Sequence, residues 1–364
     1  MPRTLTALFV MLRLLVIIAL AGAAIPAGAG AARALGAHQV VILVADDFTS
    51  PDLADLAGRT YDPGATCAVS LEGQAFAVRG VSAAPIPAPH GELVMAELEE
   101  LVADANAADF IRLVPVDIHG AATDVVAQRI EDALDAHPAD VYMLNMSFAL
   151  IPCEYLTAFA EFGGQLLSAR DAKDLNRYRG IFQRAVLFYD GTVFPVMSQK
   201  AQQATDLDPL QSLLADRPDV IPVAAAGNFG LDFPFWPGAW GQVISVSASQ
   251  GMGYHAGAPW DKKKDTPLLT AESQSPGQQK RISNYGEVMM PGEYASDFGP
   301  VSGTSFAAPR LSVALALYAS DVGPSICRDS DGNPALASGD WDNRTLQAAA
   351  QASCPALAPY LPQP

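Results

Sequence analysis

The chain has 364 residues, half of them apolar, which suffices for one large domain or two modest ones. Only 17% of the residues are charged, and the formal net charge at pH 7 is −17. Because like charges repel, we expect no binding to nucleic acid or to an anionic membrane. The short basic run 262–264 is followed at once by Asp265, so it forms no basic stripe.

The amino end has the pattern of a secretory signal peptide. Arg3 and Arg13 flank an apolar stretch, and small residues with several Ala-x-Ala cleavage options follow. The sequence therefore predicts a signal peptide at 1–34 and a secreted or periplasmic protein that is not held at a membrane once the signal is removed. The alternative is an uncleaved membrane anchor, because residues 4–24 are just long enough to span a bilayer.

Beyond the signal, apolar β-branched runs alternate with helical patterns. This alternation predicts an α/β fold: a doubly wound, mostly parallel sheet with helices on both faces. A first helix is expected from His90. The other expected elements are strands at 40–45, 111–116, 141–146, 220–225 and 243–248, and a helix at 121–136. Polar residues follow several of these strands at their carboxyl ends, where open α/β sheets place their ligands.

Two segments depart from the alternation. The polar and helical stretch at about 150–215 is expected to be an inserted segment within a domain that covers 35–324. Residues 325–364 are loop-like and form an expected short C-terminal extension.

Four cysteines allow three pairings, and we favour Cys327 with Cys354 because that pair closes a short loop. The complementary pair, Cys67 with Cys153, is the weaker prediction, and buried free thiols are the alternative.

Residues 303–305, Gly-Thr-Ser, lead straight into an apolar helical run. This places the hydroxyl of Ser305 at the amino end of a buried helix, where backbone N–H groups and the helix dipole favour negative charge. A serine in that position can attack a carbonyl group and find the developing oxyanion stabilised. Ser305 is therefore the candidate nucleophile.

A serine nucleophile needs a base for its proton, and the base needs an acid that holds its tautomer. Among the five histidines, His90 is the leading base because it begins a helix. Asp46 and Asp47 both follow a buried strand, and the residue types leave open which one faces the imidazole. Asn228 follows another strand, and an amide donor to an oxyanion is worth ~3–4 kcal/mol of barrier lowering.

These blocks resemble the subtilisin-like serine peptidases, the subtilases. The order Asp, His, Asn, Ser agrees with that family, and the run 303–309 is similar to its serine block. Residues 225–228 are similar to its oxyanion segment, and 282–286 with 290–292 to the stretch before its serine. The resemblance covers roughly 38–320 and implies a subtilisin-like fold.

The resemblance implies that a polypeptide substrate is hydrolysed through an acyl-enzyme on Ser305. His90 would be the general base, Asp46 the orienting acid and Asn228 the oxyanion donor. The residues expected to line the substrate are Ser147, Phe148, Ala149, Ala225, Ala226 and Gly227. An esterase of the α/β-hydrolase type is not favoured, because its elbow needs glycine where Ala307 stands.

The chain departs from the family in two catalytic blocks. The family's Asp-Thr/Ser-Gly is here Asp46-Asp47-Phe48, which keeps Asp47 open as the orienting acid. The block after His90 keeps only the glycine and the valine, and Glu92 stands in the first turn. The alternative reading is therefore a catalytically weak or inactive member that binds peptides or a partner chain.

No pro-segment is evident between the signal and Asp46, so the chain either folds unaided or requires a folding or inhibitory partner chain. The chemistry itself requires no cofactor. Subtilases often bind structural Ca²⁺, and residues 329–333 offer closely spaced oxygen ligands. They do not form an EF-hand, because Pro334 occupies the glycine position, and an acidic turn closed by the disulfide is the favoured reading.

Overall fold

The computed structural model describes residues 38–49, 59–62, 65–70, 88–153, 156, 208–228, 234–249, 283–284, 286–297 and 299–322. All of these belong to one compact unit, Ala37–Pro364. The predicted signal peptide, most of the expected insertion and the C-terminal extension lie outside the described residues. Cys327, Cys354 and the candidate calcium ligands at 329–333 therefore lie outside them as well.

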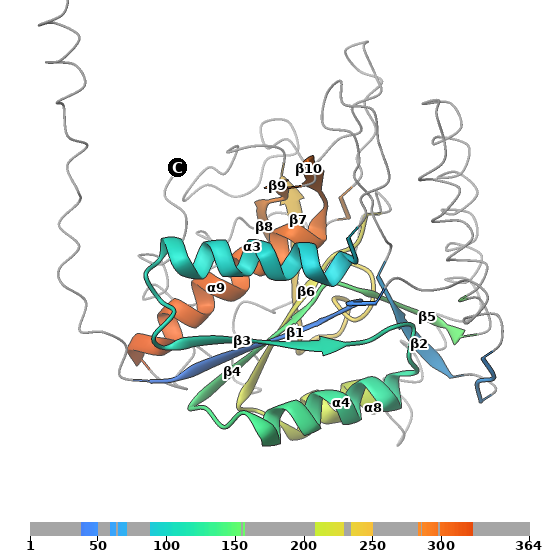
Figure 1. Cartoon of the computed structure of the whole chain (residues 1–364). Helices are drawn as coiled ribbons and strands as arrows, with labels where there is room; N and C mark the ends of the chain where they lie inside the picture. Colours follow the sequence, from blue (N-terminus) through green and yellow to red (C-terminus); the bar gives the residue numbers. More distant parts are fainter. Residues whose placement is uncertain are drawn as a thin grey trace, which may run out of the picture. The chain divides into compact units, whose positions relative to one another are not determined.

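A parallel, 6-stranded sheet forms the centre of the unit, with strand order β3-β1-β4-β6-β7-β8 (Figure 1). Its strands are β1 (Val40–Asp46), β3 (Ile111–Asp117), β4 (Val141–Met146), β6 (Val220–Ala225), β7 (Ile244–Ser249) and β8 (Val288–Pro291). The predicted α/β class with a parallel sheet is confirmed. All of these strands except β8 coincide, within a residue or so, with a predicted run.

Helices cover both faces of the sheet, as predicted. On one face lie α3 (His90–Asp104) and α9 (Thr304–Val322), and on the other α4 (Thr123–Ala136) and α8 (Pro209–Asp216) (Figure 1). Alternate residues of β1 serve the two cores: Val40 and Ile42 pack with α3 and α9, whereas Val41 and Leu43 pack toward α4 and α8. Burial on both faces explains why the strands read as continuous apolar runs.

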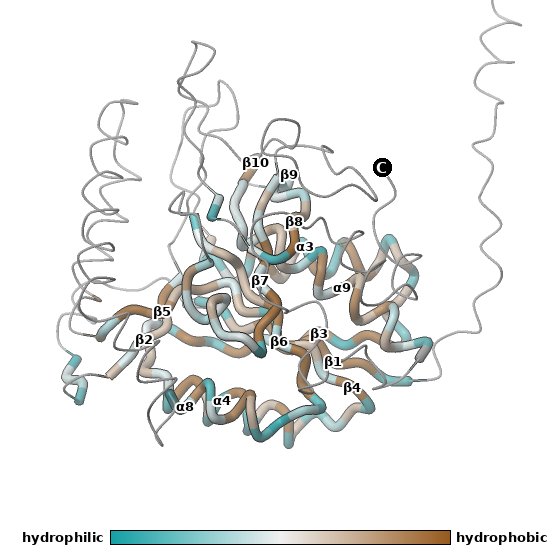
Figure 2. Tube along the Cα trace, turned by 180° about the vertical axis from the view of Figure 1, so that it is seen from behind, coloured by the Kyte–Doolittle hydropathy of each residue, from teal (hydrophilic) through white to brown (hydrophobic). Residues whose placement is uncertain are grey.

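The helices differ in how much of their surface is buried. Along α4, hydrophilic and hydrophobic residues alternate, as expected of a helix with one face in solvent (Figure 2). By contrast, α9 is buried along almost its whole length and packs across β1, β4, β6, β7 and β8. Small residues at Ala307, Ala308, Ala314 and Ala316 allow this close approach to the sheet.

Two short antiparallel pairs, which the sequence did not predict, flank the main sheet. β2 (Thr66–Val69) pairs with β5 (Ala149–Pro152), and a disulfide joins Cys67 to Cys153 with 4.9 Å between their Cα atoms. This bridge is the pairing that the sequence ranked second. β9 (Glu293–Ser296) pairs with β10 (Gly299–Ser302), which leads directly into α9.

The two ends of the expected insertion belong to the body of the fold. β5 forms its beginning, and α8, whose Leu210 and Leu214 are buried, forms its end. Within the described ranges, no helix combines the length and apolarity needed to cross a membrane.

β1 lies between β3 and β4 in the sheet, so the strand order reverses direction at β1. A crevice at the carboxyl ends of strands forms at such a switch point. Asp46 ends β1 there and Ser147 follows β4, so the fold brings two of the predicted site segments together.

Candidate active site

Ser305 lies in the first turn of α9, directly after the β9–β10 hairpin, and its side chain is largely buried. The Ser147 hydroxyl donates a hydrogen bond of 3.1 Å to the Ser305 carbonyl oxygen. Asn145 in turn donates to the Ser147 hydroxyl at 3.0 Å. The end of β4 therefore holds the backbone of the candidate nucleophile in place.

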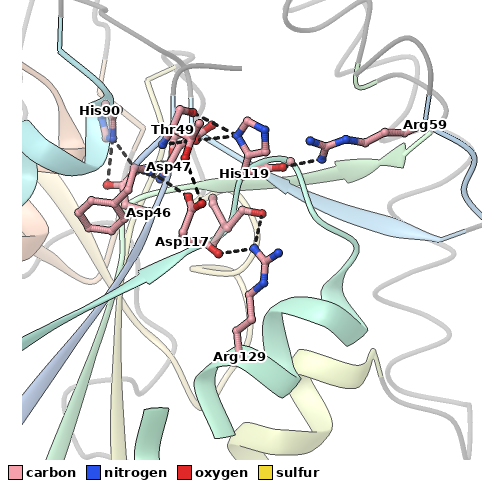
Figure 3. Close-up of polar contacts among 12 residues, drawn as sticks. Asp46, Asp47, Thr49, Arg59, His90, Asp117, His119 and Arg129 are labelled. Carbon is pink, nitrogen blue, oxygen red and sulfur yellow. Dashed lines mark hydrogen bonds and ion pairs between the residues drawn. The ribbon is translucent and has the colours of Figure 1, made fainter. Parts of the chain in front are cut away.

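Asp46 and His90 are in direct contact. The Nδ1 atom of His90 lies 2.8 Å from Oδ1 and 2.9 Å from Oδ2 of Asp46, and both side chains are buried (Figure 3). The His90 ring packs against Phe306, the neighbour of Ser305, with ring centroids 5.9 Å apart. The first turn of α3 therefore meets the first turn of α9, and of the two adjacent aspartates it is Asp46 that faces the imidazole.

Other donors surround the Asp46 carboxylate. The backbone N–H of Asp47 donates to Oδ1 at 2.7 Å, and the Ser70 hydroxyl donates to the same oxygen. Hydrogen bonds to a buried carboxylate stabilise its charged form. Sequence reasoning missed Ser70, which lies outside every motif and reaches Asp46 only because β2 pairs with β5.

Asp47 turns away from His90 toward His119. Its Oδ1 lies 3.4 Å from the His119 Nδ1, and Asp117 and Thr49 lie close by (Figure 3). Burial, reinforced by the charge of Asp46, raises the pKa of Asp47 to about 7, and the nearby His119 opposes the rise. The two carboxyl groups, adjacent in sequence, therefore have different environments and separate partners.

The Asn228 amide is oriented by Thr304. Its Oδ1 accepts the Thr304 N–H at 2.9 Å and the Thr304 hydroxyl at 3.1 Å, so Nδ2 is the donor left on the other side. Gly303 lets the amide approach, because a Cβ atom at that position would lie 3.0 Å from Nδ2. Gly227, at a φ of 101°, takes a conformation that favours glycine and turns the chain into Asn228.

Asn284 holds the segment before Asn228, a role that the sequence did not reveal. Its backbone N–H donates to the Gly227 carbonyl and its side-chain amide to the Ala226 carbonyl, both at 2.8 Å. The sequence pointed to the block 282–286 only as part of the family resemblance. A buried asparagine that binds two successive carbonyl groups fixes the segment after β6 to the segment that precedes β8.

The other predicted site residues lie around this centre. Phe148 is buried in the core beside β2 and β5, and Ala149 begins β5. Ala225 ends β6, and Ala226 and Gly227 follow it toward Asn228. Their contact with a substrate remains a prediction.

Glu92, in the first turn of α3, is exposed. Within the described part of the chain, no group of His, Cys, Asp and Glu side chains is arranged to hold a metal ion.

A model of the subtilase family matches residues 106–349, which include Asn228 and Ser305 but neither Asp46 nor His90. No curated protein matches the chain.

Several solved structures are similar to the chain, with low sequence identity and low TM-scores. The self-cleaved protease domain of PatA is 19% identical, with a TM-score of 0.36, over 80% of this chain and 86% of that one. A cold-adapted subtilisin-like serine proteinase is 16% identical, with a TM-score of 0.35, over 80% of each chain. The prenylagaramide maturation protease PagA is 15% identical, with a TM-score of 0.37, over 90% and 96%.

Proposed function

Because this chain belongs to the subtilase family, we propose that it is a serine endopeptidase that cleaves polypeptides through an acyl-enzyme on Ser305. The observation that carries the proposal is the buried contact of 2.8 Å between His90 and Asp46 beside the first turn of α9. A base held by an acid next to a serine is the arrangement that activates a hydroxyl nucleophile.

In the proposed reaction, the Ser305 hydroxyl attacks the carbonyl carbon of the substrate while His90 accepts the hydroxyl proton. Asp46 holds the imidazole so that Nδ1 carries its proton and Nε2 is the base, and it stabilises the imidazolium that forms. The protonated His90 then gives its proton to the leaving amine. Water repeats the sequence on the ester carbonyl and releases the second product.

The oxyanion of the tetrahedral adduct would be stabilised by the Ser305 backbone N–H and the Nδ2 of Asn228. The fixed orientation of the Asn228 amide supports this role, because Thr304 engages its oxygen from two sides. A donor that is already oriented needs no reorganisation when charge develops.

We also propose that the protein acts outside the cytoplasm, as its signal-like amino end predicts. The disulfide between Cys67 and Cys153 supports this location, because disulfides persist mainly in oxidising compartments. The proposed partner is a polypeptide substrate; the chain either folds unaided or is assisted by a separate folding or inhibitory chain.

The test is cleavage of a denatured protein by the chain without residues 1–34, with product ends read by mass spectrometry. Ser305→Ala should abolish cleavage and labelling by a fluorophosphonate. The matched control is Ser320→Ala, the same change at another buried serine of α9, and it should retain both. Cleavage that survives in Ser305→Ala would refute the proposed nucleophile. A folded wild-type chain that neither cleaves nor labels would favour the peptide-binding alternative.

A further inference from the structure

We infer that Glu97 and Arg310 are positioning residues, whose ion pair, buried on the Glu97 side, fixes the helix that begins with His90 against the helix that carries Ser305. The inference rests on the proposed function, in which His90 must take the proton of Ser305. Neither Glu97 nor Arg310 belongs to the sequence blocks that carry the proposed catalytic residues.

The pair joins α3 to α9, which lie side by side on one face of the sheet (Figure 1). Glu97 follows His90 by about two helical turns and is only 1% exposed, so it faces α9 as His90 does. The Nη2 of Arg310, about one turn beyond Ser305, lies 2.8 Å from the Glu97 Oε1. This contact therefore links the two helices close to both reacting groups, beside the apolar packing that they share.

Among the described residues, nothing else compensates the buried carboxylate. Apart from the ion pair, no hydrogen bond from a described residue reaches either carboxylate oxygen of Glu97 or the Nε of Arg310. Burial raises the pKa of Glu97 above its ordinary value, Arg310 opposes the rise, and the charge of Glu100 adds to it. Desolvation of a buried charge opposes stability, and apolar residues of similar volume often replace a buried ion pair without loss of stability.

Arg310 also reaches a third element. The same Nη2 donates to the Glu293 carbonyl at 3.0 Å, at the start of β9. The next residue, Tyr294, stacks on Phe306 with ring centroids 6.0 Å apart, and Phe306 packs against His90. The guanidinium therefore ties α3, α9 and the β9–β10 hairpin together around the aromatic contact beside His90 and Ser305.

A fixed link of this kind affects the chemical step more than substrate binding. A misplacement of about 1 Å between reacting groups is enough to cost about 100-fold in rate. The decisive variant is the double replacement Glu97→Leu with Arg310→Met, which removes the ion pair and the bond to β9 but keeps the space filled. Arg310→Met leaves the buried Glu97 carboxylate without its partner, and Glu97→Leu leaves the partly exposed guanidinium without one, so the two single replacements serve to show whether the residues are coupled.

The experiment measures kcat and KM on a peptide substrate, the thermal midpoint, and crystal structures of the wild type and the double variant. The double variant should unfold at or above the wild-type temperature, while kcat falls by about 10- to 100-fold and KM stays within about threefold. The His90–Ser305 side-chain distance should differ between the two structures.

Two controls separate positioning from general effects. Glu99→Gln changes an exposed carboxylate of the same helix, and Leu134→Ala loosens the core on the other face of the sheet. Both should keep kcat close to the wild-type value. A double variant that folds with wild-type kcat and an unchanged His90–Ser305 distance would overturn the inference, as would an equal loss of kcat in Leu134→Ala. If the wild type itself cleaves nothing, the proposed function fails, and the comparison of the two crystal structures still decides the inference.

Discussion

Asp46 and Asp47 are adjacent carboxyl groups that the fold sends to opposite sides of the end of β1. Asp46 accepts hydrogen bonds from Ser70 and the Asp47 backbone and contacts His90, whereas Asp47 faces His119. Side chains alternate direction along an extended chain, so a pair of neighbours at a strand end can serve two functions. Residue types alone could not assign them, since both are acids that follow the same strand.

Asp47 makes the stability of the fold depend on pH. Its pKa rises from 3.8 to about 7 on folding, so between these values the folded chain binds more protons than the unfolded one. This contribution to stability is fully present below about pH 4 and is lost as the pH rises through about 7. Asp47→Asn should therefore gain stability relative to the wild type from pH 4 to pH 8, on the order of 2–4 kcal/mol.

The measurement is urea unfolding of both chains at several pH values. Asp109→Asn, at an exposed aspartate of a turn, is the control and should show no such trend. A constant difference between Asp47→Asn and the wild type across this range would contradict the prediction.

At Asn228, one substitution can remove the Nδ2 donor of the side-chain amide while keeping the oxygen that accepts from Thr304. Asn228→Asp keeps an acceptor for Thr304 but removes the Nδ2 donor, so we expect kcat to fall by about 100- to 1000-fold with little change in KM. Steady-state kinetics on a peptide substrate measure this. Near-normal kcat in a folded Asn228→Asp variant would exclude Asn228 from the oxyanion hole.

At the scale of elements, the strands that could be predicted from the sequence are those formed by its longest apolar runs. β1, β4 and β6 are buried on both faces, so they read as continuous apolar segments with polar residues after them. The short strands β2, β5, β9 and β10 are four residues each, and pairing with a distant segment rather than local pattern defines them. Ser70 was missed for the same reason, because its place beside Asp46 depends on β2.

The disulfide links these short elements to the site. Cys67 lies in β2, three residues before Ser70, and its bond to Cys153 closes a separation of 86 residues. Replacement of both cysteines by alanine should lower the free energy of unfolding by about 2–5 kcal/mol. It should also reduce kcat, because Ser70 would hold Asp46 less firmly.

Ser70→Ala distinguishes these two effects, since it removes the bond to Asp46 and leaves the cross-link intact. We expect it to reproduce the fall in kcat with a smaller loss of stability, measured by urea unfolding and peptide kinetics. If the double cysteine variant unfolds at the wild-type urea concentration, the bridge does not stabilise the fold.

At the scale of the whole molecule, the formal net charge of −17 acts on encounters with substrate. A negative field attracts positively charged peptides, and salt screens that attraction. The value of kcat/KM for a lysine- and arginine-rich peptide should fall by several-fold between about 0.02 and 0.5 M salt, whereas that for an uncharged peptide should change little. Equal salt dependence for both peptides would show that net charge does not steer the substrate.

The burial of α9 also decides when the molecule can act. This helix is buried along nearly its whole length on one face of the sheet, and its first turn holds the hydroxyl of Ser305, the proposed nucleophile. A ribosome delivers these residues after every strand of the sheet has already been made. On the proposed function, a growing chain would therefore carry the base and its acid partner before the nucleophile, and could not digest itself or its neighbours during synthesis. The proposed activity would then begin only once α9 has packed against the sheet.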